Sequence, residues 1–434
     1  MSIDRQHGRR CARLACPLLA AVLSLAAGPV RGQDTALPPQ PTLDDTIEAG
    51  DSDAETPQRL FLKWNHYEGP WITAEIHGGV LYEGIGYSQD EGSEEQFTLD
   101  AESKFRDARF MVKGKFPQSK RAVTYTSAFM YDGPSDDWFV RETGVMVAVP
   151  ELWGHVFVGR TKEGFSLNKV MSGYAGWTME RATITDATIP ILADGIKWLG
   201  FIPEKRLLWN LGFYNDWFSE GQSFSTYDKQ AVARLAWLPV ASEATRTLLH
   251  LGLNLRYGKP EDGELRLRSR PEAFPAPYFV DTGTFAADNT RMAGLEAYYR
   301  PRNWLFGGEY YVQEASSPAH GDPVFHGGDL AVSWLITGEV RQYNTRGGYF
   351  NQVSPATSVF EGGRGAWEAV FRVSYIDLDD GDLQGGKFWR LTPMVNWHLS
   401  DVARFELAYG YGELDRFAAT GATQFLQTRI QLQF

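Results

Sequence analysis

The basic residues of this chain recur at spacings that place their side chains on one face of an extended segment. Arg109 and Lys113 are four residues apart, and Arg160 and Lys162 are two apart. Because successive side chains of a β-strand point to opposite faces, each pair shares a face. Clustered Lys and Arg side chains attract anions and replace part of their hydration, and the planar fork of Arg suits phosphate oxygens. These spacings predict anion binding.

The apolar neighbours of the basic residues show which face is which. Phe110, Val112, Gly114 and Phe116 alternate with Arg109 and Lys113, so the basic side chains lie opposite the apolar ones. The same parity places Arg234 opposite Leu235, and Arg256 opposite Leu253. We therefore expect Arg109, Lys113, Arg160, Lys162, Arg234 and Arg256 on the polar face of their strands.

Familiar catalytic and metal-binding patterns are missing from the sequence. It contains no His-Glu-x-x-His pair, no Gly-x-Ser-x-Gly segment and no phosphate-loop motif. The acidic stretch Asp377–Asp382 resembles a calcium loop, but Gly381 stands where a ligand is needed, so we expect a hairpin turn there. The sequence predicts no enzyme activity, no metal and no cofactor.

Alternation with a period of two is the dominant pattern of the chain. In the last nine residues, Leu426, Thr428, Ile430, Leu432 and Phe434 alternate with Gln427, Arg429, Gln431 and Gln433. A dry soluble core could bury such charged side chains only at a cost of several kcal/mol each when unpaired. The pattern favours an antiparallel transmembrane β-barrel with an apolar outer face and a wet lumen.

The first residues resemble a secretion signal. Four arginines precede an apolar run from Leu14 to Ala27, and small residues follow before Gln33. We expect residues 1–32 to be a cleaved signal peptide, 33–60 a flexible Pro-rich acidic periplasmic leader, and 61–434 the barrel. Both cysteines fall within 1–32, so the mature chain would have no disulfide or Cys-bound metal.

Charge argues against a nucleic-acid-binding protein, and hydropathy argues against a protein anchored by a membrane-spanning helix. Of 42 basic and 54 acidic residues, residues 1–32 hold five arginines and Asp4, which leaves 37 and 53 and a net charge of −16. Nucleic acid is therefore not an expected partner. The mature chain has no apolar run of about 18 residues, so it offers no helical membrane anchor.

Several motifs resemble those of the phosphate- and polyphosphate-selective porin family. Phe105–Arg109 resembles its Arg-Arg-Ala-Arg strand motif, with Asp107 in place of the second Arg. Gly159–Leu167 and Met179–Arg181 resemble the strand that leads into its constriction loop and the end of that loop. The C-terminal likeness covers Phe360–Gly363, Gly365–Glu368, Ile376–Asp380, Gly385–Lys387 and Asn396–Trp397.

This resemblance implies a 16-stranded barrel that forms a homotrimer, with a loop folded into the lumen. It adds Lys169 and Arg181, within and at the end of that loop, to the expected pore-lining cations. Asp107 reverses the sign of one basic position of the family motif. Because neighbours in a regular strand point to opposite faces, only one of Arg106 and Asp107 is expected to face the channel.

Together these features predict an outer-membrane porin for passive diffusion of small anions. Phosphate or polyphosphate is the expected solute, and outer-membrane lipid and lipopolysaccharide are the expected surroundings. Two alternatives stay open: a porin of the same fold with weak or different selectivity, and a barrel hydrolase whose site no local motif reveals. A third, a soluble β-protein, would need a cover for its apolar strand faces.

Overall fold

The structure is a computed structural model that describes residues 65–133, 136–215 and 227–434. The expected signal peptide (1–32) and leader (33–60) lie outside the described residues, as do residues 61–64 of the expected barrel. None of the helices in the described residues is long and apolar enough to cross a membrane.

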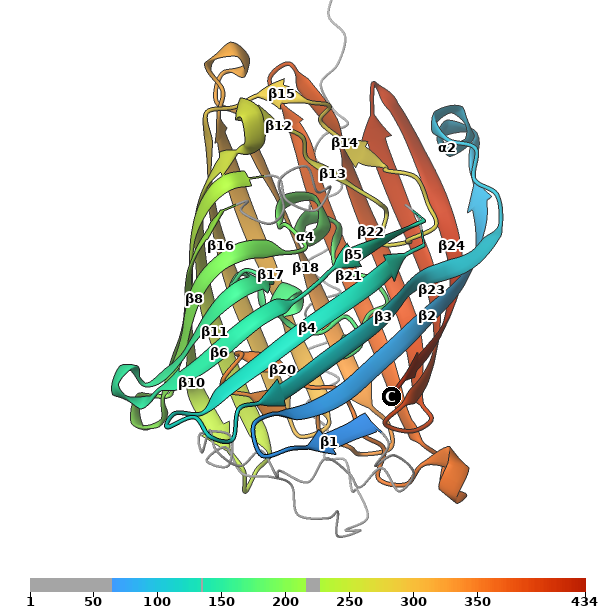
Figure 1. Cartoon of the computed structure of the whole chain (residues 1–434). Coiled ribbons are helices and arrows are strands. Elements are labelled where there is room, and N and C mark those ends of the chain that lie inside the picture. Colours follow the sequence, from blue (N-terminus) through green and yellow to red (C-terminus); the bar gives the residue numbers. More distant parts are fainter. Residues whose placement is uncertain (1–64, 134–135, 216–226) are drawn as a thin grey trace, which may run out of the picture. The chain divides into compact units, whose positions relative to one another are not determined.

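Long antiparallel strands form one closed sheet (Figure 1). In chain order they are β2 (Thr73–Gln89), β3 (Glu102–Lys115), β4 (Val123–Asp132), β5 (Asp137–Val140), β6 (Thr143–Val149), β7 (Gly154–Thr161), β8 (Ala193–Ile202), β9 (Leu207–Asn215), β10 (Tyr227–Ser242), β11 (Thr247–Pro260), β16 (Asn289–Pro301), β17 (Trp304–Ser316), β18 (Val324–Leu335), β21 (Ala366–Asp380), β22 (Leu383–His398), β23 (Ala403–Arg416) and β24 (Ala419–Gln433). The short β1 (His66–Glu68) adds to the start of β2.

The pairing of the first and last long strands closes the barrel. β24 runs antiparallel to β2 from Gly79 opposite Gln433 to Gln89 opposite Thr423. β5 and β6 both pair with β4 and together form one interrupted strand. Counted in this way, the described barrel has sixteen strands. Closure pairs the backbone groups that an open sheet edge would leave without partners, which a lipid environment requires. The prediction of a 16-stranded antiparallel barrel is confirmed.

Side chains sort by parity between the two faces of the wall. In β24, Leu426 is 57% exposed and Leu432 is 54% exposed, whereas Arg429 is 2% exposed. β11 repeats the pattern, with Leu253 outside and Arg256 inside. The outer surface is thus apolar and the inner one polar, as the alternation predicted.

The connections differ in length between the two ends of the barrel. At the end that carries Phe434, residues 302–303 and 399–402 make tight turns. At the opposite end lies a long loop between Pro260 and Asn289, which contains β12 (Glu264–Leu265), β13 (Arg268–Ser269), β14 (Val280–Asp281) and β15 (Phe285–Ala286). The acidic stretch ending at Asp382 is a β21–β22 hairpin turn, as expected.

The remaining elements are short. They are α2 (Glu91–Gln96), α3 (Leu167–Val170), α4 (Thr183–Thr188), β19 (Tyr343–Asn344), β20 (Tyr349–Phe350) and the 3-10 turns η4 (Pro150–Leu152), η5 (Pro203–Lys205), η6 (Glu261–Gly263), η7 (Pro318–His320) and η8 (Val359–Glu361).

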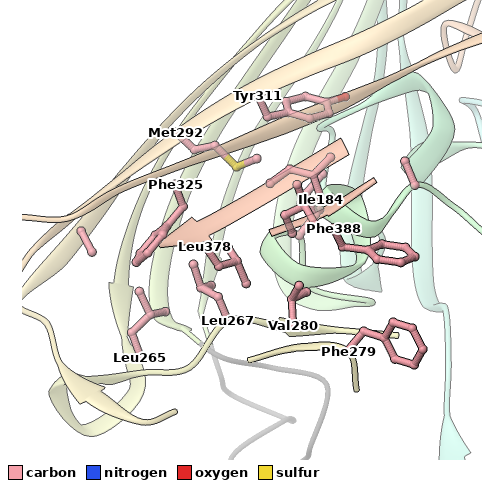
Figure 2. Packing of buried hydrophobic residues seen from close by; sticks show 14 of the residues in the cluster. Ile184, Leu265, Leu267, Phe279, Val280, Met292, Tyr311, Phe325, Leu378 and Phe388 are labelled. Atoms are coloured by element: carbon pink, nitrogen blue, oxygen red, sulfur yellow. The ribbon is translucent and has the colours of Figure 1, made fainter. Parts of the chain in front are cut away.

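Three connecting segments fill much of the lumen. They are the inward loop (162–192), the outer loop (261–288) and the long turn (336–365). The long turn lies at the Phe434 end, where the turns at 302–303 and 399–402 are short. Ile184 of the inward loop packs with Phe279 and Val280 of the outer loop and with Phe388 of the wall (Figure 2). Trp177 of the inward loop packs instead with residues of the long turn. The inward loop is therefore held between the other two segments, as a constriction loop requires.

Candidate functional site: a basic constriction

A cavity of about 420 Å³ lies between the inward loop and the wall around β3 to β5. Its lining comes from that wall, the inward loop and the tip of the outer loop. Eight basic side chains line it against four acidic ones. The basic residues are Arg106, Arg109, Arg141, Lys162, Lys169, Arg181, Arg268 and Arg270, and the acidic ones are Asp132, Glu180, Asp186 and Glu272. Basic groups in a narrow lumen with low-dielectric walls concentrate a positive potential.

Three cations of the inward loop bind main-chain carbonyls instead of carboxylates. Lys162 Nζ donates to the Met171 carbonyl at 2.7 Å, and Lys169 Nζ donates to the Ile189 carbonyl at 2.7 Å. Arg181 donates to the carbonyls of Asn168 at 2.8 Å and Met171 at 2.9 Å. Within residues 65–133, 136–215 and 227–434, none of the three forms a salt bridge with a carboxylate. Their positive charges therefore remain available to an anion.

The first turn of the inward loop is fixed by one acidic side chain. Ser166 adopts a left-handed backbone, with φ of 67°, and its side chain accepts the amide hydrogen of Lys169 as the N-cap of α3. Glu309 on β17 accepts from the Ser166 hydroxyl at 2.5 Å and from the Asn168 amide at 2.9 Å. A cap of this kind satisfies amides that the helix leaves unpaired. Lys169 is thereby held on the turn that faces the cavity.

Arginines on β21, β23 and β24 hold the second half of the inward loop. Arg404 donates to the Gly176 carbonyl at 2.6 Å, and Arg372 donates to the Glu180 carbonyl at 2.7 Å. Arg429 donates to the Met179 carbonyl and to the Glu180 carboxylate. Sequence reasoning missed these anchors. The alternation in the last nine residues already placed Arg429 opposite the apolar face, but no pattern in the sequence indicated which loop carbonyls these arginines would meet.

A β-bulge in β3 corrects the expectation for Arg106 and Asp107. Leu81 pairs with Asp107 and Tyr82 with Phe105, so Arg106 is an extra residue. A bulge changes the parity of the strand. Asp107 accepts from Arg109 at 2.6 Å and from the Tyr174 hydroxyl at 3.1 Å, while Arg106 donates to Glu180 at 3.0 Å. Both side chains face the lumen, so the prediction that only one would do so is wrong.

The structure brings four of the eight predicted residues together at the cavity. Those four are Arg109, Lys162, Lys169 and Arg181. Arg160, Arg234 and Arg256 lie elsewhere in the lumen, in buried ion pairs with Asp194, Glu296 and Glu163. Lys113 lies about 3.4 Å from Glu75 and is about half exposed. The cavity also includes Arg106, Arg141, Arg268 and Arg270, which were not among the predicted site residues.

The inward loop, which lies between the spanning strands β7 and β8, lowers the pKa of one of its cations into the physiological range. Burial, together with the nearby charge of Arg181, lowers the pKa of Lys169 to about 7. Burial disfavours the charged form of an amine, and so does a neighbouring like charge. A bound anion would offset both effects. No group of three or more His, Cys, Asp or Glu residues in the described chain could hold a metal ion.

Curated relatives match parts of this chain. An uncharacterized protein of Caulobacter vibrioides is 30% identical over 174 residues, which cover 39% of this chain and 35% of that protein. Porin O of Pseudomonas aeruginosa is 24% identical over 199 residues, which cover 39% of this chain and 44% of that protein. The matches thus span less than half the length of either relative.

Solved structures share the fold at low sequence identity. The anion-selective porin from Comamonas acidovorans has a TM-score of 0.52 at 12% identity, over 84% of this chain and 100% of its own. The outer-membrane channel DcaP of Acinetobacter baumannii has a TM-score of 0.54 at 8% identity, over 85% and 99%. OmpT of Vibrio cholerae, in its trimer form, has a TM-score of 0.53 at 14% identity, over 84% and 100%.

At these identities the solved structures establish the fold alone. The family model described as phosphate-selective porin O and P extends further, because it matches residues 72–434, from the first long strand to the terminal Phe434. The chain therefore belongs to the phosphate-selective porin O and P family of outer-membrane porins.

Proposed function

We propose that this protein is a passive outer-membrane channel that prefers small anions, with phosphate or polyphosphate as its solute. The observation that carries the proposal is the set of three cations, Lys162, Lys169 and Arg181, that face the cavity without a carboxylate partner among the described residues. Anion selectivity needs basic groups in a narrow lumen, and binding has to stay weak enough for release. No catalytic group or cofactor is required.

The chemistry of the cavity suits oxyanions. Arg109 and Arg181 can present two N–H groups to two oxygens of one anion, which favours phosphate and carboxylate over chloride. Lys162 and Lys169 add point charges close by. The net charge of the whole chain is negative, but exposed acids farther away than a Debye length of about 10 Å contribute little field at the constriction.

Arg160, Arg234 and Arg256 have a supporting role in this proposal. Each is buried and ion-paired, so its charge is largely cancelled locally. Arg256 also donates to the Thr188 carbonyl and so ties the end of α4 to the wall of the barrel. Arg256 thus positions the inward loop, and Arg234 holds the long turn through the carbonyls of Gly347 and Gly348, whereas the anion itself meets the cavity cations.

The proposal includes the biological setting. The protein is exported with residues 1–32 cleaved, and it assembles as a homotrimer surrounded by outer-membrane lipid and lipopolysaccharide. The apolar outer face of the strands supports the lipid contact, as the exposed side chains Leu295, Leu330 and Leu426 illustrate. The trimer is expected from the family resemblance.

Planar bilayer recordings test the proposal. The purified full-length mature protein, placed in a KCl gradient, should give a reversal potential that favours chloride, and added inorganic phosphate should reduce the chloride current. A reversal potential that shows potassium carrying most of the current would overturn the anion preference.

A channel of the same fold with weak selectivity is the second candidate. The observation that favours it is the 2.6 Å contact of Asp107 with Arg109, which cancels part of the positive charge where the family motif has an arginine. In this case the reversal potential in the same gradient lies near zero and phosphate leaves the current unchanged.

A further inference from the structure

The lining of the cavity at the constriction combines charged side chains with apolar ones. The three inward-loop cations supply positive charge, whereas Phe139, Ile191, Phe274 and Tyr278 add aromatic and aliphatic surface. Ile191 is 44% exposed, and the side chains of Phe139 and Tyr278 are partly exposed. An apolar wall contributes nothing to the binding of a fully hydrated inorganic ion. Its presence indicates a solute with an apolar part.

Cationic and aromatic side chains alternate from the outer loop toward the constriction. Arg268 stacks on Tyr278 with its guanidinium carbon 4.2 Å from the ring centre, and Arg270 lies 4.7 Å from the same centre. Arg270 also lies 5.6 Å from the centre of the Phe274 ring, and Arg106 lies 3.7 Å from it. Guanidinium groups over ring faces make cation–π contacts, and Arg106 and Arg270 also donate to Glu180 and to the Ala276 carbonyl.

We propose that this cavity also binds planar organic anions, and that it holds aromatic carboxylates more tightly than aliphatic carboxylates of the same charge. The inference rests on the proposed anion channel and names the substrate class of that same site. The carboxylate takes the place of water at Arg181 and Lys162, and the ring lies along Tyr278, Phe274 and Ile191.

The size of the site agrees with such a solute. Pockets for small organic ligands measure roughly 300–1,000 Å³ and combine apolar walls with a few placed polar groups. The cavity here, at about 420 Å³, falls within that range and has both kinds of lining. A single phosphate would leave the apolar part of the cavity unused.

The test compares two dicarboxylate dianions, one with an aromatic ring and one without. Terephthalate and succinate are titrated separately against the chloride current of the full-length protein in bilayers. Terephthalate should block with an apparent dissociation constant about tenfold lower than succinate, which corresponds to about 1.4 kcal/mol for one added ring contact. Equal dissociation constants for the two dianions would overturn the inference.

Two variants locate the ring contact. Tyr278→Leu and Phe274→Leu keep apolar bulk but remove an aromatic face, and each should reduce the terephthalate preference to about threefold or less. Phe213→Leu, on the outer face of the barrel where Phe213 is 56% exposed, is the matched control and should retain the full preference. Both residues lie in the outer loop, but Tyr278 is partly exposed whereas Phe274 is only 7% exposed, so Tyr278→Leu provides the test even if Phe274→Leu fails to fold. An unchanged preference in Tyr278→Leu would contradict the proposed site.

Failure of this inference differs from failure of the proposed function. A chloride-selective reversal potential with no difference between terephthalate and succinate leaves the anion channel in place and removes the aromatic preference. A potassium-selective reversal potential removes both.

Discussion

Lys162 and Arg181 donate to the same acceptor, the main-chain carbonyl of Met171, at 2.7 and 2.9 Å. Two cations that share one neutral acceptor repel each other, and a carbonyl dipole compensates only part of their charge. An anion in the adjoining cavity would relieve this repulsion. The inward loop therefore concentrates a positive potential at the cavity.

Removal of one of these charges should weaken the anion preference. Arg181→Gln removes a unit charge worth about 1 kcal/mol to an ion a few ångströms away in hydrated surroundings. The anion-to-cation permeability ratio should then fall by about fivefold. Reversal potentials in a KCl gradient measure the ratio. Lys120→Gln, in an exposed turn outside the cavity, is the matched control. Equal losses in both variants would show that the effect is not local.

Neutralisation of Asp107 should have the opposite effect. Asp107 lies 2.6 Å from Arg109, and its carboxylate is almost fully buried. Asp107→Asn keeps the shape of the side chain and its contact with Tyr174, but frees the charge of Arg109. We expect a rise of about threefold in the permeability ratio and stronger phosphate block. No change in either quantity would mean that Arg109 does not face the permeating ion.

The anion preference should depend on pH near neutrality. The pKa of Lys169 is lowered to about 7 by burial and by Arg181, so the amine is charged below that pH and neutral above it. The permeability ratio should therefore fall as the pH rises from about 6 to about 8. Lys169→Arg stays charged across this range and should flatten the change. An identical pH profile in the wild type and this variant would exclude Lys169 as its source.

The arginine anchors should control both stability and the width of the channel. Arg429 is 2% exposed and bridges Glu83, Glu180 and the Met179 carbonyl. Arg429→Met leaves buried carboxylates without their cation, at a cost of about 3 kcal/mol. A folded barrel and its heat-unfolded form migrate as different bands on a denaturing gel, and Arg429→Met should convert from the folded to the unfolded band at a lower temperature. The open-channel current should also become larger and noisier as the inward loop moves.

An exposed pair provides the comparison for Arg429. Arg291 lies 3.6 Å from Glu314, and its side chain is 65% exposed. Exposed ion pairs of this kind contribute between about 0 and 1 kcal/mol. Arg291→Met should therefore leave the conversion temperature and the current noise nearly unchanged. If the two variants behaved alike, the anchoring role of Arg429 would be rejected.

Local patterns in the sequence were sufficient to predict the wall of the barrel. The alternation around Leu253 and Leu426 fixed which side chains face outward, because the side-chain period of a strand is set by backbone geometry alone. The same rule failed at Arg106 and Asp107, where a bulge adds one residue to β3. A bulge depends on the partner strand, and no residue type in the sequence marked it.

The site itself was only partly predictable. Lys162 was expected from strand parity and Arg181 from the likeness to a family motif, and both line the cavity. Arg234 had the same inward parity as Arg109, yet it is neutralised by Glu296, 62 residues away in the chain. Parity shows that a charge faces the lumen, but whether the charge is cancelled depends on which carboxylate lies across from it.

The sequence by itself determined a membrane barrel with a hydrated interior, because strand parity and the segregation of apolar from charged side chains are local properties. Only the tertiary structure decided which cations remain available to a solute. Arg160, Arg234 and Arg256 meet carboxylates, whereas Lys162, Lys169 and Arg181 meet carbonyls of a loop folded between two other segments. The physical reason is that charge compensation acts over a few ångströms between residues that the chain brings together only on folding.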